Sequence, residues 1–482
     1  MPEECLKGEE LAYALVTPYT LHKSRTGGIL ARLLWANVRL AAVRMYAPAP
    51  DSDFIRQYCD GIYDPEEKRV PLRYQKLLIR YVLENFGYPN ARGISNRMLL
   101  VIFRGENAQH LIEEAAGHIG QDVRGDDVRG TYGDFIQEDS SADYVQKARE
   151  RAKKELRRYP ALQRVEHEPE YHRFFEPAVL TGVTPEMTES HLRLFSRNAY
   201  SDGGYVLRAL PDINEAEVET SMVILKPESF RRRNPLPGNL LDFFARTGMF
   251  ITGAKMVSLT VEQASRFYAA KLPQFREQLK AMVGGKAEDI MEKARRLSET
   301  VVSEVDGIEQ IPTPAQAIRL AHSAEMLFAR DDVPEPGQIK ADILARACSL
   351  LEEKANSFHP DPSLFDEIAE ELKELNAQAE FDELIRYMTG VDVETGKPIE
   401  PERETQCMAL LYSGPDALRV IRQRLRELRE VYGQNVLQNR AHASDPEEDP
   451  VQETEILGMP NAPEGETKPC DVCRLVEACY EV

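Results

Sequence analysis

Apolar and polar positions follow one order twice along the chain. Residues 11–20 form a short apolar run that ends at a proline, and a helix-like stretch follows Gly27 and Gly28. Residues 221–227 form a second such run, and Gly238 introduces another amphipathic stretch. A short apolar run bounded by proline or glycine is typical of a buried strand. The pattern therefore predicts a strand followed by a helix at both places.

The correspondence continues further along the chain. Residues 99–117 and 407–425 each show an apolar run, a turn with glycine and an amphipathic stretch, while residues 74–82 resemble 381–390. Two copies of one ordered set of elements indicate an internal repeat. Each copy is predicted as strand–helix–strand–helix–strand–helix, which favours an α+β class with two ferredoxin-like βαββαβ domains and antiparallel sheets.

The repeat predicts the domain organisation. Amphipathic stretches separated by Pro and Gly predict a helical insertion in the second repeat, and the last residues, rich in Pro, Glu and Gly, predict a mobile tail. We expect a first repeat over 1–150, a connecting segment over 151–218, a second repeat over 219–457 with its helical insertion at 272–380, and a C-terminal tail over 458–482.

Composition narrows the class of protein. The chain has 482 residues, 42% of them hydrophobic, and a net charge of −20. So acidic a surface repels nucleic acid and anionic membranes, so we expect neither as a partner. No apolar run approaches the ~18 residues that span a membrane, and the acidic N-terminus lacks a signal pattern. We therefore expect a cytoplasmic protein.

Two motifs of the second repeat carry a resemblance to a known family. VILKPES (223–229) ends a predicted strand, and NRAHASD (439–445) lies near the end of the repeat. They resemble the Lys-Pro-Asp strand end and the Asn-x-x-His-Gly-Ser-Asp signature of nucleoside diphosphate kinases. Arg429 lies 13 residues before His442, which is the family's spacing. The resemblance covers roughly 220–271 and 380–457.

The resemblance implies roles for individual residues. His442 would be the catalytic nucleophile, because a neutral imidazole can attack a γ-phosphate near pH 7 and hold it covalently. Lys226, Arg422 and Arg429 would bind the phosphates, where arginine suits bidentate contact. Asn439 would hydrogen-bond the ribose or a phosphate.

Further residues are implied around this set. Tyr268 would lie near the phosphates and Phe381 would stack on the base, with Phe275 as the alternative for that last role. Either Glu453 or Glu455 would orient the other ring nitrogen of the histidine.

The reaction that the resemblance implies is ping-pong transfer of a γ-phosphate between nucleoside triphosphates and diphosphates. Mg²⁺ would enter as a cofactor bound to the nucleotide phosphates, with no metal site on the protein itself. The family's dimers imply that the two repeats pair within one chain, and they allow a further homo-oligomer. The alternative is a nucleotide-binding regulatory or scaffold protein of the same fold without turnover.

The chain departs from the family pattern in several places. Glu228 stands where the family has aspartate, and Arg422 lies only seven residues before Arg429, so a long loop is missing. In the first repeat Thr17 and Glu113 occupy the positions of the lysine and the first arginine, and Ser140 is the nearest counterpart of the histidine. We therefore predict that the first repeat is catalytically inert.

The cysteines leave two interpretations open. Cys470, Cys473 and Cys479 form a C-x₂-C-x₅-C pattern near the end of the chain. Zinc would need a fourth ligand, and the tail supplies no nearby histidine. Ordinary thiols on a mobile tail are the interpretation that the pattern favours.

Overall fold

The computed structural model describes most of the chain in two units. The described residues are 8–49, 53–68, 70–87, 94–119, 125–137, 143–165, 173–199, 204–206, 210, 217–304, 312–328, 341–399, 405–433, 439–444, 450–459 and 471–480. One unit comprises Met1–Ser258, Glu404–Gly433 and Arg440–Val482, and the other Leu259–Arg403 and Gln434–Asn439. None of the described helices combines the length and the hydrophobicity that crossing a membrane requires.

The first repeat forms a four-stranded antiparallel sheet in the order β2-β3-β1-β6. Its strands are β1 (Glu10–Val16), β2 (Arg39–Tyr46), β3 (Met98–Gly105) and β6 (Val179–Thr181). The helices between the first three strands and after β3 are α1 (Pro18–His22), α2 (Thr26–Leu34), α3 (Phe54–Ile62), α4 (Leu72–Asn85) and α5 (Ala108–Ala116).

The fourth strand of this sheet comes from the segment that we expected to be a connection. β6 pairs with β1, so the first sheet extends past residue 150, the expected end of the repeat. Between β3 and β6 the chain also forms a two-stranded sheet, and a helix follows β6. These elements are α6 (Val128–Tyr132), β4 (Asp134–Gln137), α7 (Asp143–Leu156), the 3₁₀ helix η1 (Pro160–Arg164), β5 (Arg173–Glu176) and α8 (Pro185–Arg197).

The second repeat forms another four-stranded antiparallel sheet, in the order β10-β7-β9-β8. Its strands are β7 (Glu219–Leu225), β8 (Phe250–Ser258), β9 (Gln406–Gly414) and β10 (Ala441–Ala443). With it lie η4 (Pro227–Ser229), α9 (Leu236–Phe243), η5 (Ala245–Thr247), α15 (Ala417–Tyr432) and α16 (Pro450–Ile456). The predicted α+β class with antiparallel sheets is confirmed, and both sheets have the chain order 4-1-3-2.

The two sheets match in backbone detail. Each has a register shift in the pairing of its second and third strands, between Leu40 and Ala42 in one and between Ile251 and Gly253 in the other. In each, a residue with a left-handed backbone directly precedes the helix after the third strand, Asn107 before α5 and Asp416 before α15. Non-glycine residues adopt such a backbone rarely. The repeat seen in the sequence is therefore a structural repeat.

The repeats contact each other through equivalent helices. α2 packs against α9, and β2 lies beside β8. A Cβ added to Gly27 would lie 2.2 Å from the nitrogen of Asp242, and one added to Gly238 would lie 2.1 Å from the nitrogen of Ala31. Each glycine thus allows the backbone of the opposite helix to approach. One apolar core contains residues of both sheets and of both helices.

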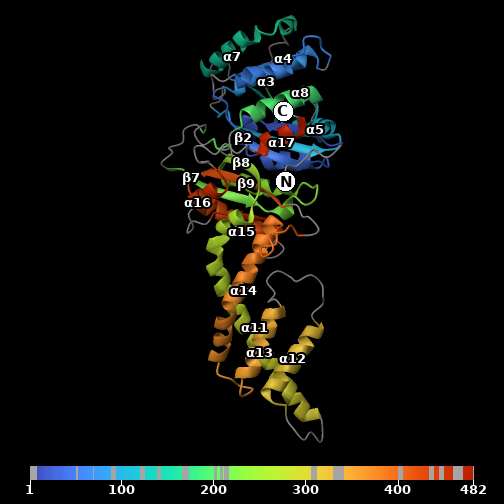
Figure 1. The fold of residues 1–482 in the computed structure, drawn as a ribbon. Helices are drawn as coiled ribbons and strands as arrows, with labels where there is room; N and C mark the ends of the chain where they lie inside the picture. The colour runs from blue at the N-terminus through green and yellow to red at the C-terminus, as the bar shows by residue number, and fades with distance from the viewer. Residues whose placement is uncertain are drawn as a thin grey trace. The chain divides into compact units, whose positions relative to one another are not determined.

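The other unit is helical, and its bounds are wider than the insertion that we expected over 272–380. It contains α10 (Val261–Tyr268), η6 (Ala269–Lys271), α11 (Leu272–Glu304), α12 (Pro314–Phe328), α13 (Ala341–Lys354) and α14 (Ser363–Thr389). The long helices α11 and α14 run alongside each other (Figure 1), and the four helices α11 to α14 enclose an apolar core of their own.

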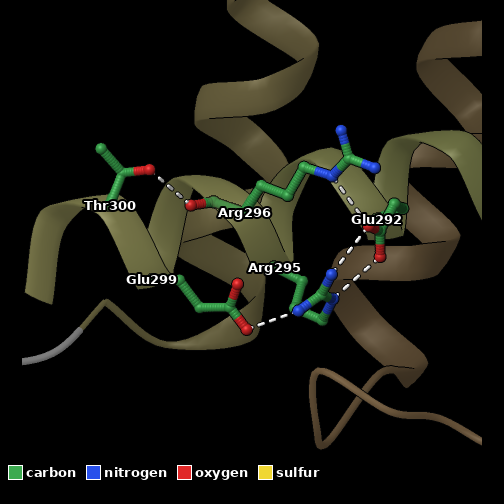
Figure 2. A network of polar contacts seen from close by, with 5 residues as sticks. All are labelled: Glu292, Arg295, Arg296, Glu299 and Thr300. Atoms are coloured by element: carbon green, nitrogen blue, oxygen red, sulfur yellow. Dashed lines mark hydrogen bonds and ion pairs between the residues drawn. The ribbon is translucent and has the colours of Figure 1, made fainter. Parts of the chain in front are cut away.

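The outer face of this helical unit carries ion pairs. Glu292 accepts hydrogen bonds from Arg295 and Arg296, and Arg295 also contacts Glu299, as Figure 2 shows. These side chains are three or four residues apart on α11, the spacing at which helix neighbours meet. Exposed pairs of this kind stabilise a helix only slightly, so the buried apolar core is the main source of the unit's stability.

The C-terminal residues differ from the expected mobile tail. Asp471–Tyr480 form helix α17, in which Val472 and Val476 are fully buried against the apolar core on the other face of the first sheet. Its apolar positions, four residues apart, lie on one face of a helix, a signal that the Pro-rich stretch before it obscured. Cys473 is a free thiol, whereas Cys479 is disulfide-bonded; Cys470 lies outside the described residues.

Candidate functional site

His442 lies on an edge strand of the second sheet. β10 pairs with β7 so that His442 is opposite Ile224, and the pairing continues where the nitrogen of Lys226 donates to the carbonyl of Arg440 at 2.9 Å. Lys226 is the first residue after β7, where Pro227 ends the strand. Both candidate side chains are buried, with 4% of His442 and 3% of Lys226 exposed.

The imidazole of His442 is held by a carboxylate on α16. Its Nε2 lies 2.9 Å from Oε1 of Glu453, which is itself buried. An ionised carboxylate accepts only, so this contact places a proton on Nε2 and leaves the lone pair of a neutral ring on Nδ1. Of the two glutamates named from the sequence, Glu453 makes the contact, while Glu455 is exposed.

Burial controls the charge of Lys226. Removal from water lowers the pKa of its ammonium group to about 8; the neighbouring Glu228 acts in the opposite direction and Arg429 lowers it further. Glu228 is buried and its Oε1 accepts a hydrogen bond from the nitrogen of Arg440 at 2.9 Å. Lys226 is therefore a cation at neutral pH, and it loses its charge when the pH rises slightly above neutral.

The two arginines occupy one helix. Arg429 is half-buried, and its Nη2 donates to the carbonyl oxygen of Ala441 at 2.9 Å, next to His442. Arg422 is also half-buried on α15. Seven residues are about two helical turns, so both arginines lie on the same face of α15. Lys226, Arg429, His442 and Glu453 are thus gathered around β10.

The remaining predicted residues belong to the helical unit. Tyr268 on α10 and Phe381 on α14 are buried there, and Asn439 lies in the same unit. Phe275, the alternative for the base-stacking role, is on α11, and its side chain lies outside the described residues.

The first repeat presents different side chains at the same backbone positions. Val16, the last residue of β1, pairs with Val179, and Leu225, the last residue of β7, pairs with Ala441. The next residue on each edge strand is Leu180 in the first sheet and His442 in the second, so Leu180 is the counterpart of His442. The sequence had suggested Ser140, which lies outside the described residues. Because the fourth strand of this sheet is β6, which begins at residue 179, the counterpart comes later in the chain than the motif comparison indicated.

The counterpart of Lys226 is Thr17, whose hydroxyl is hydrogen-bonded to a buried carboxylate. Thr17 follows β1, and its nitrogen donates to the carbonyl of Ala178 at 3.1 Å, as the nitrogen of Lys226 does to Arg440. The hydroxyl of Thr17 donates to Oε1 of Glu176 at 2.6 Å, and Tyr81 donates to the same carboxylate. A fully buried carboxylate at this position repels a phosphate.

Arg440 and Glu228 are the site residues that sequence analysis missed as positioning groups. Arg440 has a left-handed backbone (φ 70°), and Ala178 has the same conformation (φ 64°) at the equivalent point of the first sheet. In the sequence, the only sign of this role was that Glu228 lies two residues after Lys226. Nothing in the sequence indicated that its carboxylate would accept a hydrogen bond from the backbone nitrogen of Arg440.

Neither a metal centre nor a relative adds to this picture. Within the described part of the chain, no group of His, Cys, Asp and Glu side chains is arranged to hold a metal ion. No protein-family model matches the chain, and no curated protein matches it either.

Proposed function

We propose that the second repeat is a nucleoside diphosphate kinase that transfers a phosphate through His442. The observation that carries this proposal is the 2.9 Å contact between Nε2 of His442 and Glu453, beside the cations Lys226 and Arg429. A histidine with a defined tautomer next to positive charge is what covalent phosphoryl transfer needs. The strand order 4-1-3-2 supports a ferredoxin-like assignment of both sheets.

In the first half-reaction, Nδ1 of His442 attacks the γ-phosphorus of a nucleoside triphosphate. The P–N bond forms as the bond from phosphorus to the β–γ bridging oxygen breaks, and the diphosphate leaves with that electron pair. Glu453 keeps the proton on Nε2 and stabilises the positive charge that the ring acquires. A second diphosphate then attacks the phosphohistidine through a terminal oxygen, and the P–N bond breaks.

The cations act on the phosphates. Lys226, Arg422 and Arg429 would neutralise the non-bridging oxygens, on which charge spreads in the transition state. Mg²⁺ would be carried by the nucleotide phosphates and would neutralise further charge there. Tyr268, Phe381 and Asn439 remain proposed contacts of the nucleotide. A cytoplasmic location, where nucleotides are abundant, is part of the same proposal.

One observation favours a second candidate function. His442 is 4% exposed and Lys226 is 3% exposed, although a γ-phosphate must reach both for transfer. If no motion opens the site, the protein is a nucleotide-binding regulatory or scaffold protein without turnover. The two functions differ in whether a phosphate becomes attached to His442.

The test is incubation of the full chain with γ-³²P-labelled ATP and Mg²⁺, followed by a chase with a nucleoside diphosphate. The proposal expects label that is lost in acid, as phosphohistidine is, and that passes to the diphosphate. His442→Gln keeps an N–H group for Glu453 but removes the nucleophile, and it should remove the label. The exposed His110→Ala is the matched control and should label normally.

The outcomes separate the two candidates. Label that persists in His442→Gln, or that survives acid, overturns phosphohistidine chemistry at this residue. Absence of label combined with binding of ADP, measured by calorimetry, supports the regulatory alternative. Melting curves of both variants establish that each is folded before labelling is compared.

A further inference from the structure

A groove of about 370 Å³ lies on the first repeat. Its described lining comes from α2 and the turn that follows it, from α5, and from the residues just before α6. The apolar residues of this lining are Trp35, Ala36, Leu111 and Ala115. The volume falls within the range of sites that hold small organic groups, so an amino-acid side chain fits in it.

Trp35 is the most exposed large apolar side chain among the described residues, with 74% of its surface open to solvent. It is also the only tryptophan of the chain. An exposed tryptophan beside a concave apolar surface is typical of an interaction site, because covering the ring removes a large apolar area from water. Its position therefore indicates a surface that a partner covers.

Carboxylates outnumber cations in the lining of this groove. Glu114, Asp126 and Asp127 line it, and Arg32 is the one cation of its described lining. Nη1 of Arg32 donates to the backbone carbonyl of Asp126. The carboxylate of Asp127 accepts from the nitrogen of Gly130 at the start of α6, whereas Glu114 and Asp126 are exposed. The excess of negative charge attracts a cationic group.

One wall of this groove has an aromatic counterpart in the second repeat. Gly27 and Gly238 play the same role where α2 meets α9. Arg32 and Phe243 each lie five residues after that glycine, so they occupy equivalent positions. The other wall is α5, and its equivalent in the second repeat is α15.

The two helical walls differ by one long side chain. Counted from the left-handed residue that precedes each helix, Ala115 on α5 corresponds to Arg424 on α15. Nε of Arg424 donates to the carbonyl oxygen of Phe243 at 2.8 Å, and its guanidinium lies over the Phe243 ring, 4.5 Å from the centroid. Glu427 forms an ion pair with Arg424. In the second repeat an arginine stacked on an aromatic ring therefore lies where the first repeat has only the methyl group of Ala115.

We propose that this groove is a docking site for a basic segment of a partner protein, and that an arginine of the partner enters it. The guanidinium would stack on Trp35 as that of Arg424 stacks on Phe243. The carboxylates of Glu114 and Asp126 would pair with the same group. Tryptophan and arginine are enriched among the residues that dominate binding at protein interfaces. The inference uses none of the residues of the proposed kinase site and does not depend on that function.

The experiment measures binding of a short peptide of leucine, alanine and arginine to the full chain. Fluorescence anisotropy of the fluorescein-labelled peptide gives the affinity. The control peptide has citrulline in place of arginine, which keeps the shape of the side chain and removes its charge. The citrulline peptide should bind at least about tenfold more weakly. Unlabelled arginine peptide should also shift the emission of Trp35, which as the chain's only tryptophan reports on the groove directly.

One variant fills the groove from within. Ala115→Arg supplies the side chain that Arg424 supplies in the second repeat, so it should weaken binding of the arginine peptide at least about tenfold. Ala281→Arg is the matched control, because it adds the same charge at an exposed position of α11. This control should bind the peptide as the intact chain does.

A second variant removes the negative charge of the groove. Glu114→Gln/Asp126→Asn should weaken binding of the arginine peptide by about tenfold. Glu353→Gln/Asp366→Asn makes the same change in charge at exposed positions elsewhere and should leave the affinity unchanged. Melting curves establish that every variant is folded before affinities are compared.

Each arm has a defined meaning. Unchanged affinity in Ala115→Arg, or unchanged emission of Trp35 at saturation, places the peptide elsewhere and overturns the proposal. Equal binding of the arginine and citrulline peptides overturns the role of the guanidinium. Equal losses in the two carboxylate variants assign binding to the overall negative charge of the chain and also overturn the proposal. No binding of the arginine peptide to the intact chain has the same consequence.

Discussion

The two sheets have the same backbone but different chemistry at equivalent places. The second sheet has Lys226 and His442 where the first has Thr17 and Leu180. On the following helix, Arg422 is replaced by Glu113, since each lies eight residues after the last residue of its strand, Gly414 and Gly105. The differences fall on side chains suited to phosphate, and the backbone around them is retained.

One arginine is shared and teaches which residues support the fold. Arg129 donates to the carbonyl of Val179 at 3.3 Å, and Arg429 donates to the equivalent carbonyl of Ala441 at 2.9 Å. Burial lowers the pKa of Arg129 to about 10. Because the arginine persists in the repeat that lacks a nucleophile, we infer that it holds the last strand in both sheets. Its match to the family motif is therefore weaker evidence of catalysis than the lysine and the histidine.

The largest effect that we predict concerns the contact between α2 and α9. It tests whether the two repeats contribute equally to this contact. Gly27→Ala and Gly238→Ala each place a Cβ 2.2 or 2.1 Å from the backbone of the opposite helix. The added Cβ would force α2 and α9 apart and weaken their packing, so each variant should lose about 3 kcal/mol of unfolding free energy. Thermal and urea unfolding monitored by near-UV circular dichroism measures this.

A glycine elsewhere in the same unit provides the control for this contact. A Cβ on Gly105 would approach nothing closer than 3.9 Å, so Gly105→Ala should change the stability little. If Gly27→Ala or Gly238→Ala melts like Gly105→Ala, the helix crossing does not hold the repeats together. If only one of them is destabilised, the contact is not as symmetric as the distances indicate.

The second prediction concerns the carboxylate that contacts His442. Glu453→Gln should slow phosphorylation of His442 by about 10–100-fold, because an amide stabilises the charged ring less and can favour the wrong tautomer. Rapid-quench labelling measures the rate. Glu455→Gln, two residues along and exposed, should label at the normal rate; slow labelling in this control instead would exchange the roles of the two glutamates.

The third prediction uses the charge of Lys226. With a pKa of about 8, the group is an ammonium at pH 7 and mostly a neutral amine at pH 9. The affinity for ADP should therefore fall about tenfold between these values as the positive charge is lost. In Lys226→Arg the guanidinium stays charged, and calorimetry should show a much flatter profile. A profile of the same steepness in both proteins would assign the titration to another group.

Much of the fold could be predicted from the sequence because the pattern occurs twice. The strand before Pro227 and the helix around Gly238 were predicted from apolar spacing, and the α+β class followed from their order. The short strand β6 was not predicted. Its residues, Val179–Thr181, are too few to show a period, and their pairing with β1 depends on tertiary contact.

The site was predictable only where a motif was local. The NRAHASD motif predicted His442 as a site residue, and the structure shows its contact with Glu453. The buried contact between Glu228 and the nitrogen of Arg440 joins residues far apart in the chain, and no spacing indicates it.

The last prediction is that a variant shows no effect. It tests whether the first repeat lacks only the nucleophile. Leu180→His, made in a His442→Gln chain, places an imidazole at the equivalent strand position. We expect no acid-labile label, because Thr17 brings no positive charge and the buried Glu176 beside it repels a phosphate. Labelling with γ-³²P-ATP measures this. Adding Glu176→Gln removes the repulsion but still leaves no counterpart of the Lys226 cation, so label should stay absent. Label with Leu180→His alone would mean that one histidine suffices to restore transfer. Label only after Glu176→Gln is added would mean that the buried carboxylate, and not the missing lysine, keeps the first repeat inert.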